Sequence, residues 1–338
     1  MTDSVCGIVG FGFAFPEGGI RDAAEISRLS GVPESVVREK FGINQVFWPM
    51  NNEQPSDLAI AAAKDCLKNT GIDPLEIDLI IYFGENYSDY MIYSLGPRVQ
   101  GMIGAKNAWA YDMEAKCGTC VLALDQAKKY IQMDDNINTV MLVGGYRNVD
   151  KIDYSDQSVT FLFDTSCGGA ACILKKGHPK HNFLSYAALT DGNFANLILL
   201  PYGGTRNPIT KDNINDSYGQ FMRLTEPEIF REEFGKVTFD NLIKCQEMAL
   251  AKIGNTLEDL DFAIILHMNV RSHNTILDRL GLPPEKSFYM SDYGHLGQLD
   301  ILIALDQASK AGTLKDGDLV ALVAAGMGYT WVGGIIRW

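Results

Sequence analysis

The chain repeats one order of sequence patterns, and this internal repeat constrains its fold more strongly than any single segment does. Asp78 precedes a run of five apolar residues, and Asp261 precedes a matching run 183 residues later. The motif Ala-Leu-Asp-Gln-Ala at 123–127 returns at 304–308, an offset of 181 residues, and the apolar run 140–143 returns at 320–323, an offset of 180 residues. Three matches at nearly one offset indicate two related halves.

Both halves show the same order of elements: helix, buried strand, helix, strand, helix and strand. Such alternation predicts an α/β unit in which helices cover both faces of a largely parallel sheet. A chain of 338 residues is long enough for two units of this kind. We therefore predict an N-terminal half over residues 1–175 and a C-terminal half over residues 176–338.

Cys117 lies where the first half changes from an extended pattern to a helical one. The short stretch before it is extended in character, and residues 121–131 have the apolar spacing of a buried helix. A thiol in the first turn of a helix feels the positive end of the helix dipole and unpaired backbone N–H groups, which favour the nucleophilic thiolate. The alternative is an inert core cysteine, because free cysteines are among the most buried residues.

The repeat brings further reactive side chains to the same end of the sheet. His267 follows a buried strand of the second half, in the position that Glu85 occupies near the equivalent strand of the first half. His295 precedes the helix that corresponds to the one after Cys117. Ligands of open α/β sheets bind beyond the carboxyl ends of the strands. We therefore expect these four residues to meet at one edge, between the two halves.

Charge and composition exclude several classes of protein. The formal net charge of −13, without any Lys/Arg-rich run, argues against nucleic-acid binding. No apolar stretch reaches the roughly 18 residues of a membrane span, and the N-terminus lacks the basic region of a signal peptide. The seven scattered cysteines indicate reduced thiols in the cytoplasm. Cys117 and Cys120 have CxxC spacing, but without a second ligand pair we expect no metal site.

Five segments in order resemble the thiolase superfamily of condensing enzymes, in particular the ketoacyl-ACP synthase III type. The resemblance covers essentially the whole chain and includes an opening strand, the nucleophile segment, a Gly/Ala-rich segment, a histidine motif and a closing glycine-rich turn. These segments are residues 7–16, 110–117, 162–171, 266–271 and 326–331.

The resemblance implies a thiolase-like α/β fold, with two pseudo-symmetric halves and mixed, mostly parallel sheets in an α-β-α-β-α layering. It implies an acyltransferase in which Cys117 takes an acyl group from a CoA or carrier-protein thioester. Claisen condensation with a malonyl- or acetyl-type thioester follows, as in fatty-acid, polyketide or secondary-metabolite biosynthesis. The backbone N–H groups of Cys117 and Met327 would form the oxyanion hole, and His267 would serve the second thioester.

The chain departs from this family at the third catalytic position. Synthase III enzymes carry asparagine where this chain has His295. A Cys-His-His triad is typical of elongating ketoacyl synthases, in which both imidazoles stabilise the enolate formed when the second, malonyl thioester loses carbon dioxide. The protonation of a histidine changes near neutral pH, which that of asparagine does not. Glu85 resembles the catalytic glutamate of 3-hydroxy-3-methylglutaryl-CoA synthase, whose reaction is not decarboxylative. Synthase-like condensation or simple acyl transfer through Glu85 is therefore the alternative, and a solvated or structural carboxylate is the other interpretation.

The resemblance also implies the binding residues and partners. Lys40, Tyr93 and Asn269 are the expected substrate-binding residues. The adenine-stacking aromatic of bacterial synthase III is replaced by Val36, which leaves CoA and an acyl carrier protein both open as donors. No cofactor is expected beyond the phosphopantetheine arm of the substrate. A homodimer is expected, and a non-catalytic subunit of a larger acyltransferase complex is the alternative to an enzyme.

Overall fold

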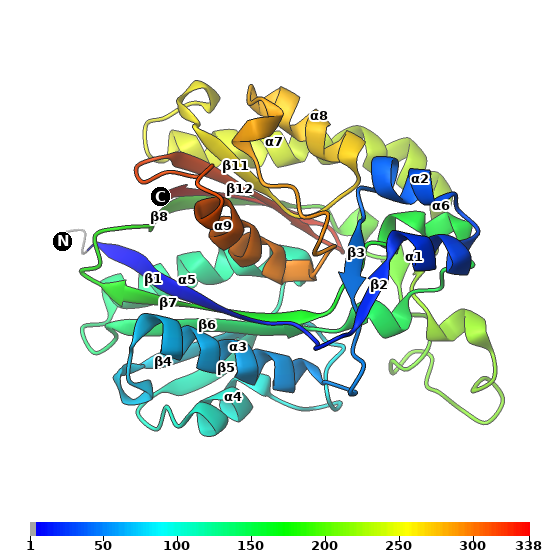
Figure 1. The fold of residues 1–338 in the computed structure, drawn as a ribbon, viewed down its shortest axis with the longest axis horizontal. Coiled ribbons are helices and arrows are strands. Elements are labelled where there is room, and N and C mark those ends of the chain that lie inside the picture. Colours follow the sequence, from blue (N-terminus) through cyan, green and yellow to red (C-terminus); the bar gives the residue numbers. More distant parts are fainter. Residues whose placement is uncertain (1–4) are drawn as a thin grey trace.

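The computed structural model describes residues 5–338, which form layers of helices around one large mixed sheet (Figure 1). The strands of that sheet are β1 (Cys6–Ala14), β4 (Leu79–Phe83), β5 (Trp109–Met113), β6 (Thr139–Tyr146), β7 (Gly168–Lys176), β8 (Asn182–Thr190), β11 (Phe262–Ile265), β12 (Leu319–Gly326) and β13 (Thr330–Arg337). Among the described residues their order is β11-β12-β13-β8-β1-β7-β6-β4-β5.

The order of the strands contains the repeat that the sequence predicts. The N-terminal series β1-β7-β6-β4 and the C-terminal series β8-β13-β12-β11 have the same succession of antiparallel, antiparallel and parallel pairings. The two series join through β1 and β8, which pair at Gly7 and Asn182. The predicted boundary between residues 175 and 176 lies at the end of β7.

Parallel pairing is confined to the two ends of the sheet, at β4–β5, β4–β6 and β11–β12. The middle is antiparallel, to a greater extent than the sequence pattern indicated. One reason is local: only three residues separate β12 from β13, and so short a connection permits antiparallel pairing alone. The mixed α/β class and the two-fold repeat are confirmed.

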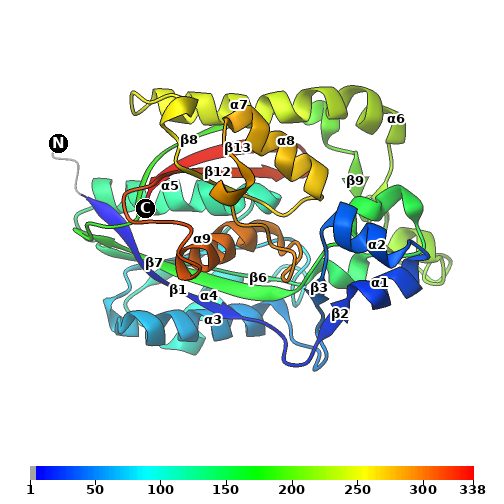
Figure 2. The same cartoon turned by 45° about the horizontal axis from the view of Figure 1, so that its top comes forward.

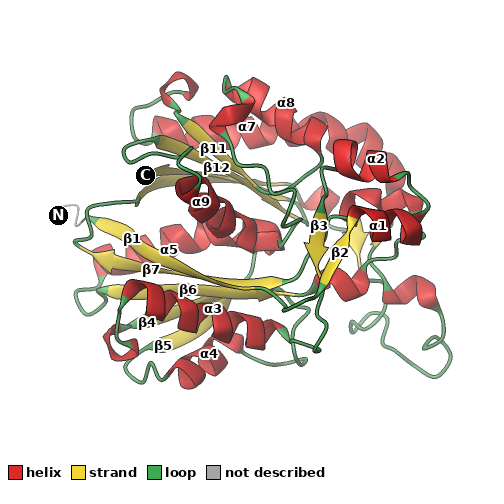
Figure 3. Ribbon diagram, viewed as in Figure 1, coloured by secondary structure: helices red, strands yellow, loops and turns green. Residues whose placement is uncertain are grey.

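Helices separate the two halves of the sheet and cover its outer faces (Figures 2 and 3). α5 (Thr119–Met133) and α9 (Asp300–Lys310) lie between the N-terminal and C-terminal strands and contact each other. α3 (Pro55–Thr70) and α4 (Leu95–Ile103) cover the outer face of the N-terminal strands. α7 (Gly235–Ala251) and α8 (Val270–Leu280) cover the C-terminal strands on the opposite side. This is the predicted α-β-α-β-α layering.

The repeated Ala-Leu-Asp-Gln-Ala motif belongs to the two central helices. Ala123, Leu124, Ala127 of α5 are fully buried, as are the equivalent residues Ala304, Leu305 and Ala308 of α9. A helix with protein on both sides must be apolar around most of its circumference, and small alanines allow close approach of the neighbouring strands. The internal sequence repeat therefore reflects two equivalent helices that are both buried in the core.

Smaller elements gather at one end of the sheet, to the right in Figure 1. They are β2 (Ile20–Asp22), β3 (Gln45–Phe47), α1 (Ala23–Ser30), α2 (Glu34–Val36), β9 (Ile198–Leu199), β10 (Arg223–Leu224) and α6 (Pro227–Ile229). Short helical turns follow α2 at Val37–Phe41 and α6 at Phe230–Phe234. None of the helices within residues 5–338 has the length and apolar composition needed to cross a bilayer.

Candidate active site

Cys117 lies in a tight turn, Lys116–Gly118, between β5 and α5, as the sequence predicts. Lys116 has a positive φ of 53°, an uncommon conformation for a residue with a side chain. Thr119 ties the turn together, because its hydroxyl accepts the Ala115 N–H at 2.8 Å and donates to the Lys116 carbonyl at 2.5 Å. The thiol is therefore held, almost completely buried, next to the N-terminus of a central helix.

The thiol of Cys117 contacts one of the predicted histidines directly. Its Sγ is 3.4 Å from Nε2 of His295. The other ring nitrogen of His295, Nδ1, is 2.6 Å from Oδ2 of Asp300, the first residue of α9 and fully buried. A thiol, an imidazole and a carboxylate thus form a line, a geometry that suits transfer of the thiol proton to the imidazole.

The second histidine has its own carboxylate partner. Nδ1 of His267 is 2.8 Å from Oδ2 of Asp164, and both residues are buried. Nε2 of His267 is buried and has no hydrogen-bond partner among residues 5–338. A buried polar nitrogen in this state carries an unmet bonding capacity, which a substrate atom can satisfy. His267 lies two residues after the end of β11 at Ile265, so the predicted position beyond a buried strand is confirmed.

Burial and neighbouring charges shift the pKa values of His295 and Cys117 in opposite directions. Burial alone would lower the pKa of His295, but the negative charge of Asp300 raises that pKa well above its ordinary value. Burial raises the pKa of the Cys117 thiol, and the positive charge of His295 and its hydrogen bond offset part of that rise. Because Asp300 stabilises the imidazolium, His295 is the natural acceptor of the Cys117 proton.

Glu85 lies on the loop after β4, half-buried, close enough to Cys117 and His295 for their charges to interact. Its Oε1 is buried and has no partner in the described part of the chain, and its Oε2 accepts a 3.4 Å hydrogen bond from the side chain of Asn148. Burial raises the pKa of this carboxyl group, and the charge of Lys116 offsets the rise only in part. A raised pKa brings a carboxyl group closer to the range in which it can act as a general acid or base.

The expected substrate-binding residues line two different cavities. Lys40 and Asn269 line a cavity of about 550 Å³ whose wall includes Asp164, the partner of His267. Tyr93 lines a second cavity of about 240 Å³, together with Glu85. Tyr93 belongs to the loop before α4, whereas Lys40 belongs to the turn after α2.

Met327 lies in the turn between β12 and β13, beside the turn that carries Cys117. The closest approach is at the preceding residue: a Cβ atom on Gly326 would lie 2.1 Å from the carbonyl oxygen of Ala115. Only glycine permits this approach of the two backbones. The predicted oxyanion-hole residues, Cys117 and Met327, therefore belong to adjoining turns.

The sequence reasoning missed Asp164 and Asp300, which orient the two histidines. A signal was present, because each is a charged residue within an apolar stretch: Asp164 follows Phe163, and Asp300 stands between Leu299 and Ile301. Carboxylates are almost never fully buried unless they are paired. An acidic residue at such a position therefore indicates a buried partner, although the sequence does not identify it.

Comparison with known proteins gives one consistent result. Residues 111–192 match the family model described as 3-oxoacyl-[acyl-carrier-protein (ACP)] synthase III, and residues 250–338 match the model of its C-terminal part. A beta-ketoacyl-[acyl-carrier-protein] synthase III of Natranaerobius thermophilus is 31% identical over 317 residues, which cover 93% of this chain and 94% of that protein. The protein of the same name from Synechocystis sp. is 28% identical over 333 residues, 98% of this chain and 97% of that one.

Solved structures agree with the sequence comparison. The crystal structure of 3-oxoacyl-[acyl-carrier-protein] synthase III from Aquifex aeolicus superposes with a TM-score of 0.84 at 25% identity, covering 98% of this chain and 100% of that one. OleA of Xanthomonas campestris, at 19% identity and a TM-score of 0.79, shares the fold and covers 100% of this chain and 99% of that one.

Proposed function

The chain belongs to the 3-oxoacyl-[acyl-carrier-protein] synthase III family of condensing enzymes, and on that premise we propose that Cys117 is its acyl-accepting nucleophile. The enzyme takes an acyl group from a CoA or carrier-protein thioester and condenses it with a malonyl- or acetyl-type thioester. The observation that carries the proposal is the 3.4 Å contact between the Cys117 thiol and Nε2 of His295, in a buried turn at a helix N-terminus.

In the first step, the sulfur of Cys117 attacks the carbonyl carbon of the donor thioester. A carbon–sulfur bond forms, the carbonyl oxygen takes the negative charge, and collapse of this intermediate expels the donor thiol. The backbone N–H groups of Cys117 and Met327 are proposed to stabilise the oxyanion. The close packing of Gly326 on Ala115 supports this role, because it brings their two turns together.

In the second step, His267 is proposed to act on the second thioester. An ionised carboxylate only accepts hydrogen bonds, so the contact with Asp164 places the proton of neutral His267 on Nδ1. The buried and unpartnered Nε2 then presents a lone pair, which suits removal of a proton from an acetyl-type substrate. The protonated ring instead presents an N–H group, which suits a carbonyl oxygen or the enolate left by loss of carbon dioxide.

The cavity of about 550 Å³ is the proposed path for the phosphopantetheine arm. Its walls combine the aromatic rings of Phe41 and Phe161 with the cations Lys40 and Arg271. The cations suit phosphate groups, and the apolar walls suit a thin chain. Both CoA and an acyl carrier protein present these groups, so the donor carrier remains open in this proposal. Asn269, on the same wall, is the proposed polar contact to the arm.

A second route uses Glu85 as the acid–base group, for a non-decarboxylative condensation or simple acyl transfer. The raised pKa of Glu85 and its unpartnered, buried oxygen favour this candidate. Tyr93 lines the same cavity of about 240 Å³ and is its proposed substrate contact. The two routes differ in stoichiometry, because only the decarboxylative one consumes a malonyl thioester and releases carbon dioxide.

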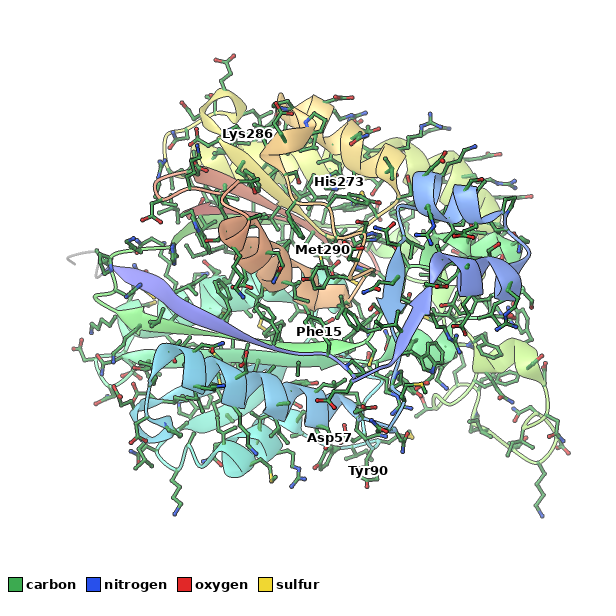
Figure 4. The ribbon with its side chains drawn as sticks, viewed as in Figure 1. Phe15, Asp57, Tyr90, His273, Lys286 and Met290 are labelled. Atoms are coloured by element: carbon green, nitrogen blue, oxygen red, sulfur yellow. The ribbon has the colours of Figure 1, made fainter. Side chains whose placement is uncertain are left out.

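We further propose a homodimer that forms at the outer edge of β5, the last strand of the sheet within the described residues. Trp109 of β5 and the loop residues Tyr90, Met91 and Ile92 expose between 48% and 105% of their side-chain surface. Tyr90 projects at the lower edge of the molecule in Figure 4. Exposed apolar residues on an open edge strand and on the neighbouring loop favour pairing with a second copy. Sedimentation of the wild type and of Ile92→Glu tests this, since a monomeric wild type excludes it.

The reactive thiol also favours a reducing compartment. All seven cysteines are free, and none needs a disulfide for the fold. We therefore propose the cytoplasm as the location. There CoA thioesters and acyl carrier proteins are both available as donors.

Intact-protein mass spectrometry tests the proposed function. The wild type and Cys117→Ala are each incubated with a panel of acyl-CoAs and of acyl carrier proteins. We expect the wild type to gain the mass of one acyl group and the variant to gain none. An adduct that persists in Cys117→Ala would assign the nucleophile elsewhere. Absence of any adduct from both classes of donor would reject the covalent mechanism.

A further inference from the structure

Asp300 is surrounded by donors, all of them from the two histidine segments. Its Oδ1 accepts the N–H of Leu296 at 2.7 Å. Its Oδ2 accepts the N–H of His267 at 2.8 Å and contacts Nδ1 of His295 at 2.6 Å. The residue is fully buried. A buried carboxylate with three donors is stabilised as an anion and can only accept hydrogen bonds.

This arrangement fixes the state of the His295 ring. Because Oδ2 of Asp300 cannot donate, the proton of neutral His295 must be on Nδ1. The other nitrogen, Nε2, therefore carries a lone pair, and it faces the Cys117 sulfur at 3.4 Å. The asparagine that other synthase III enzymes carry at this position has an amide N–H to donate. Neutral His295 has no N–H group free at that end of the ring.

We propose that Asp300 is a positioning residue that makes His295 the proton acceptor for Cys117 and orients it toward the sulfur. The inference rests on the proposed function, in which Cys117 receives the acyl group. It reassigns His295 from the second thioester, where the resemblance to elongating synthases places it, to the nucleophile. Of the two histidines, His267 is then the one left to act on the second thioester.

The proton balance of the acylation step follows from this geometry. The Sγ–H proton moves to Nε2 of His295 as sulfur bonds to the donor carbonyl carbon. The intermediate expels the thiolate of CoA or phosphopantetheine, which takes the proton back from Nε2. Asp300 gains no proton, and its charge stabilises the transient imidazolium. The acyl-enzyme therefore forms with no net gain or loss of a proton at His295.

Alkylation of Cys117 by iodoacetamide tests the proposal, because its rate reports the thiolate and needs no acyl donor. We compare the wild type, Asp300→Asn, His295→Asn and the double variant from pH 5 to 10, and identify the alkylated peptide by mass spectrometry. At pH 7 each single variant is expected to react about tenfold or more slowly, with recovery at high pH. Asp300→Asn should have no further effect in the His295→Asn background.

A carboxylate on the same helix provides the matched control. Asp306 pairs with Lys310 at 2.7 Å, so Asp306→Asn removes a negative charge from α9 away from the site and should react like the wild type. Equal slowing by Asp300→Asn with and without His295 would overturn the proposal, since the effect would not pass through the ring. Wild-type reactivity of Asp300→Asn would also overturn it.

A measurement on the unaltered protein covers the case in which Asp300→Asn does not fold. The 2.6 Å contact predicts a strongly low-field imidazole N–H proton resonance in the wild type, absent from His295→Asn. If the wild type lacks that resonance, the assigned tautomer is wrong. A different result would reject the proposed function: no thioester would acylate Cys117, although iodoacetamide would still alkylate the thiol at the expected rates.

Discussion

The backbone N–H of His295 donates a 2.7 Å hydrogen bond to the main-chain carbonyl oxygen of Asp164. The carboxylate of Asp164 holds the ring of His267, and the carboxylate of Asp300 holds the backbone of His267 and the ring of His295. Each histidine is therefore oriented by one aspartate and anchored by the other. Asp164 comes from the N-terminal half and both histidines from the C-terminal half. The site consequently depends on the packing of the two halves against each other.

Asp164→Asn is expected to separate the two half-reactions. The substitution changes the partner of His267 but keeps the main-chain carbonyl that anchors His295. Transfer of the acyl group to the second thioester should fall about 10²-fold, because a misoriented imidazole loses most of its acid–base contribution. Acylation of Cys117 should fall far less. Single-turnover mass spectrometry measures the first step, and decay of the isolated acyl-enzyme on addition of the second thioester measures the next. Equal losses in both steps would contradict the assignment of Asp164 to His267.

Gly294→Ala is expected to displace His295. Gly294 has a φ of +70°, and a Cβ atom there would lie 2.4 Å from the Asp164 carbonyl oxygen, which accepts the His295 N–H. Gly281→Ala is the matched control, with a φ of +75° and no atom within 4 Å of its Cβ. Both variants carry the left-handed strain of about 1 kcal/mol, but only Gly294→Ala carries the clash. We expect slowed Cys117 acylation in Gly294→Ala alone, and a larger fall in Tm in Gly294→Ala than in Gly281→Ala. Similar behaviour of both variants would show that the carbonyl can move without cost.

Glu85→Gln is expected to distinguish the two chemical routes. The amide keeps the shape of the side chain but cannot exchange a proton, so a route that uses Glu85 as acid–base group should lose about 10²-fold or more. Decarboxylative condensation should stay within a few-fold of the wild type. Glu114→Gln is the control, because Glu114 lines the same cavity and pairs with Lys116 while remaining exposed. Carbon dioxide release and product formation with malonyl and acetyl thioesters are the measurements. A loss with both thioesters would assign Glu85 to a step common to both routes.

Local patterns in the sequence contained the information for the fold. The two central helices are recognisable because burial on all sides requires the same small apolar residues twice, at Ala123 and at Ala304. The positions of Glu85 and His267 were predictable for a similar reason, since each follows a strand whose apolar run is continuous. Strand direction was less predictable, because apolar runs alone do not distinguish parallel from antiparallel neighbours.

The partners of the catalytic side chains could not be predicted from the sequence. Asp164 meets His267 across 103 residues of chain, and only the packing of the two halves brings them together. Asp300 is five residues from His295, yet its contact depends on the turn between them, in which Gly297 has a positive φ. Lys40 and Tyr93 lie on different loops and line different cavities, an arrangement that depends on the packing of those loops and not on local sequence patterns.

His273 of α8 is expected to make the fold sensitive to acid. Burial, followed by the positive charge of the nearby His267, lowers its pKa from 6.5 to about 4. Its ring lies edge-on to Tyr289, and its Nδ1 has no hydrogen-bond partner within the described residues. In the unfolded chain His273 therefore becomes protonated as the pH falls below 6.5, whereas in the folded protein it becomes protonated only near pH 4. Stability from this group is fully present above pH 6.5 and is lost as the pH falls toward 4.

His273→Leu removes this titration while keeping the site apolar. Between pH 7 and pH 5 the wild type should lose about 2 kcal/mol more unfolding free energy than the variant, from the difference between the two pKa values. Chemical denaturation of both proteins at the two pH values gives that difference directly, since all other groups titrate alike in both. If the variant loses as much stability as the wild type, His273 either becomes hydrated in the folded protein or titrates near its ordinary pKa. At pH 7 the imidazole of His273 is neutral in the folded state. The difference in unfolding free energy between the two proteins at that pH therefore reports the change in packing, in which leucine replaces an aromatic contact with Tyr289.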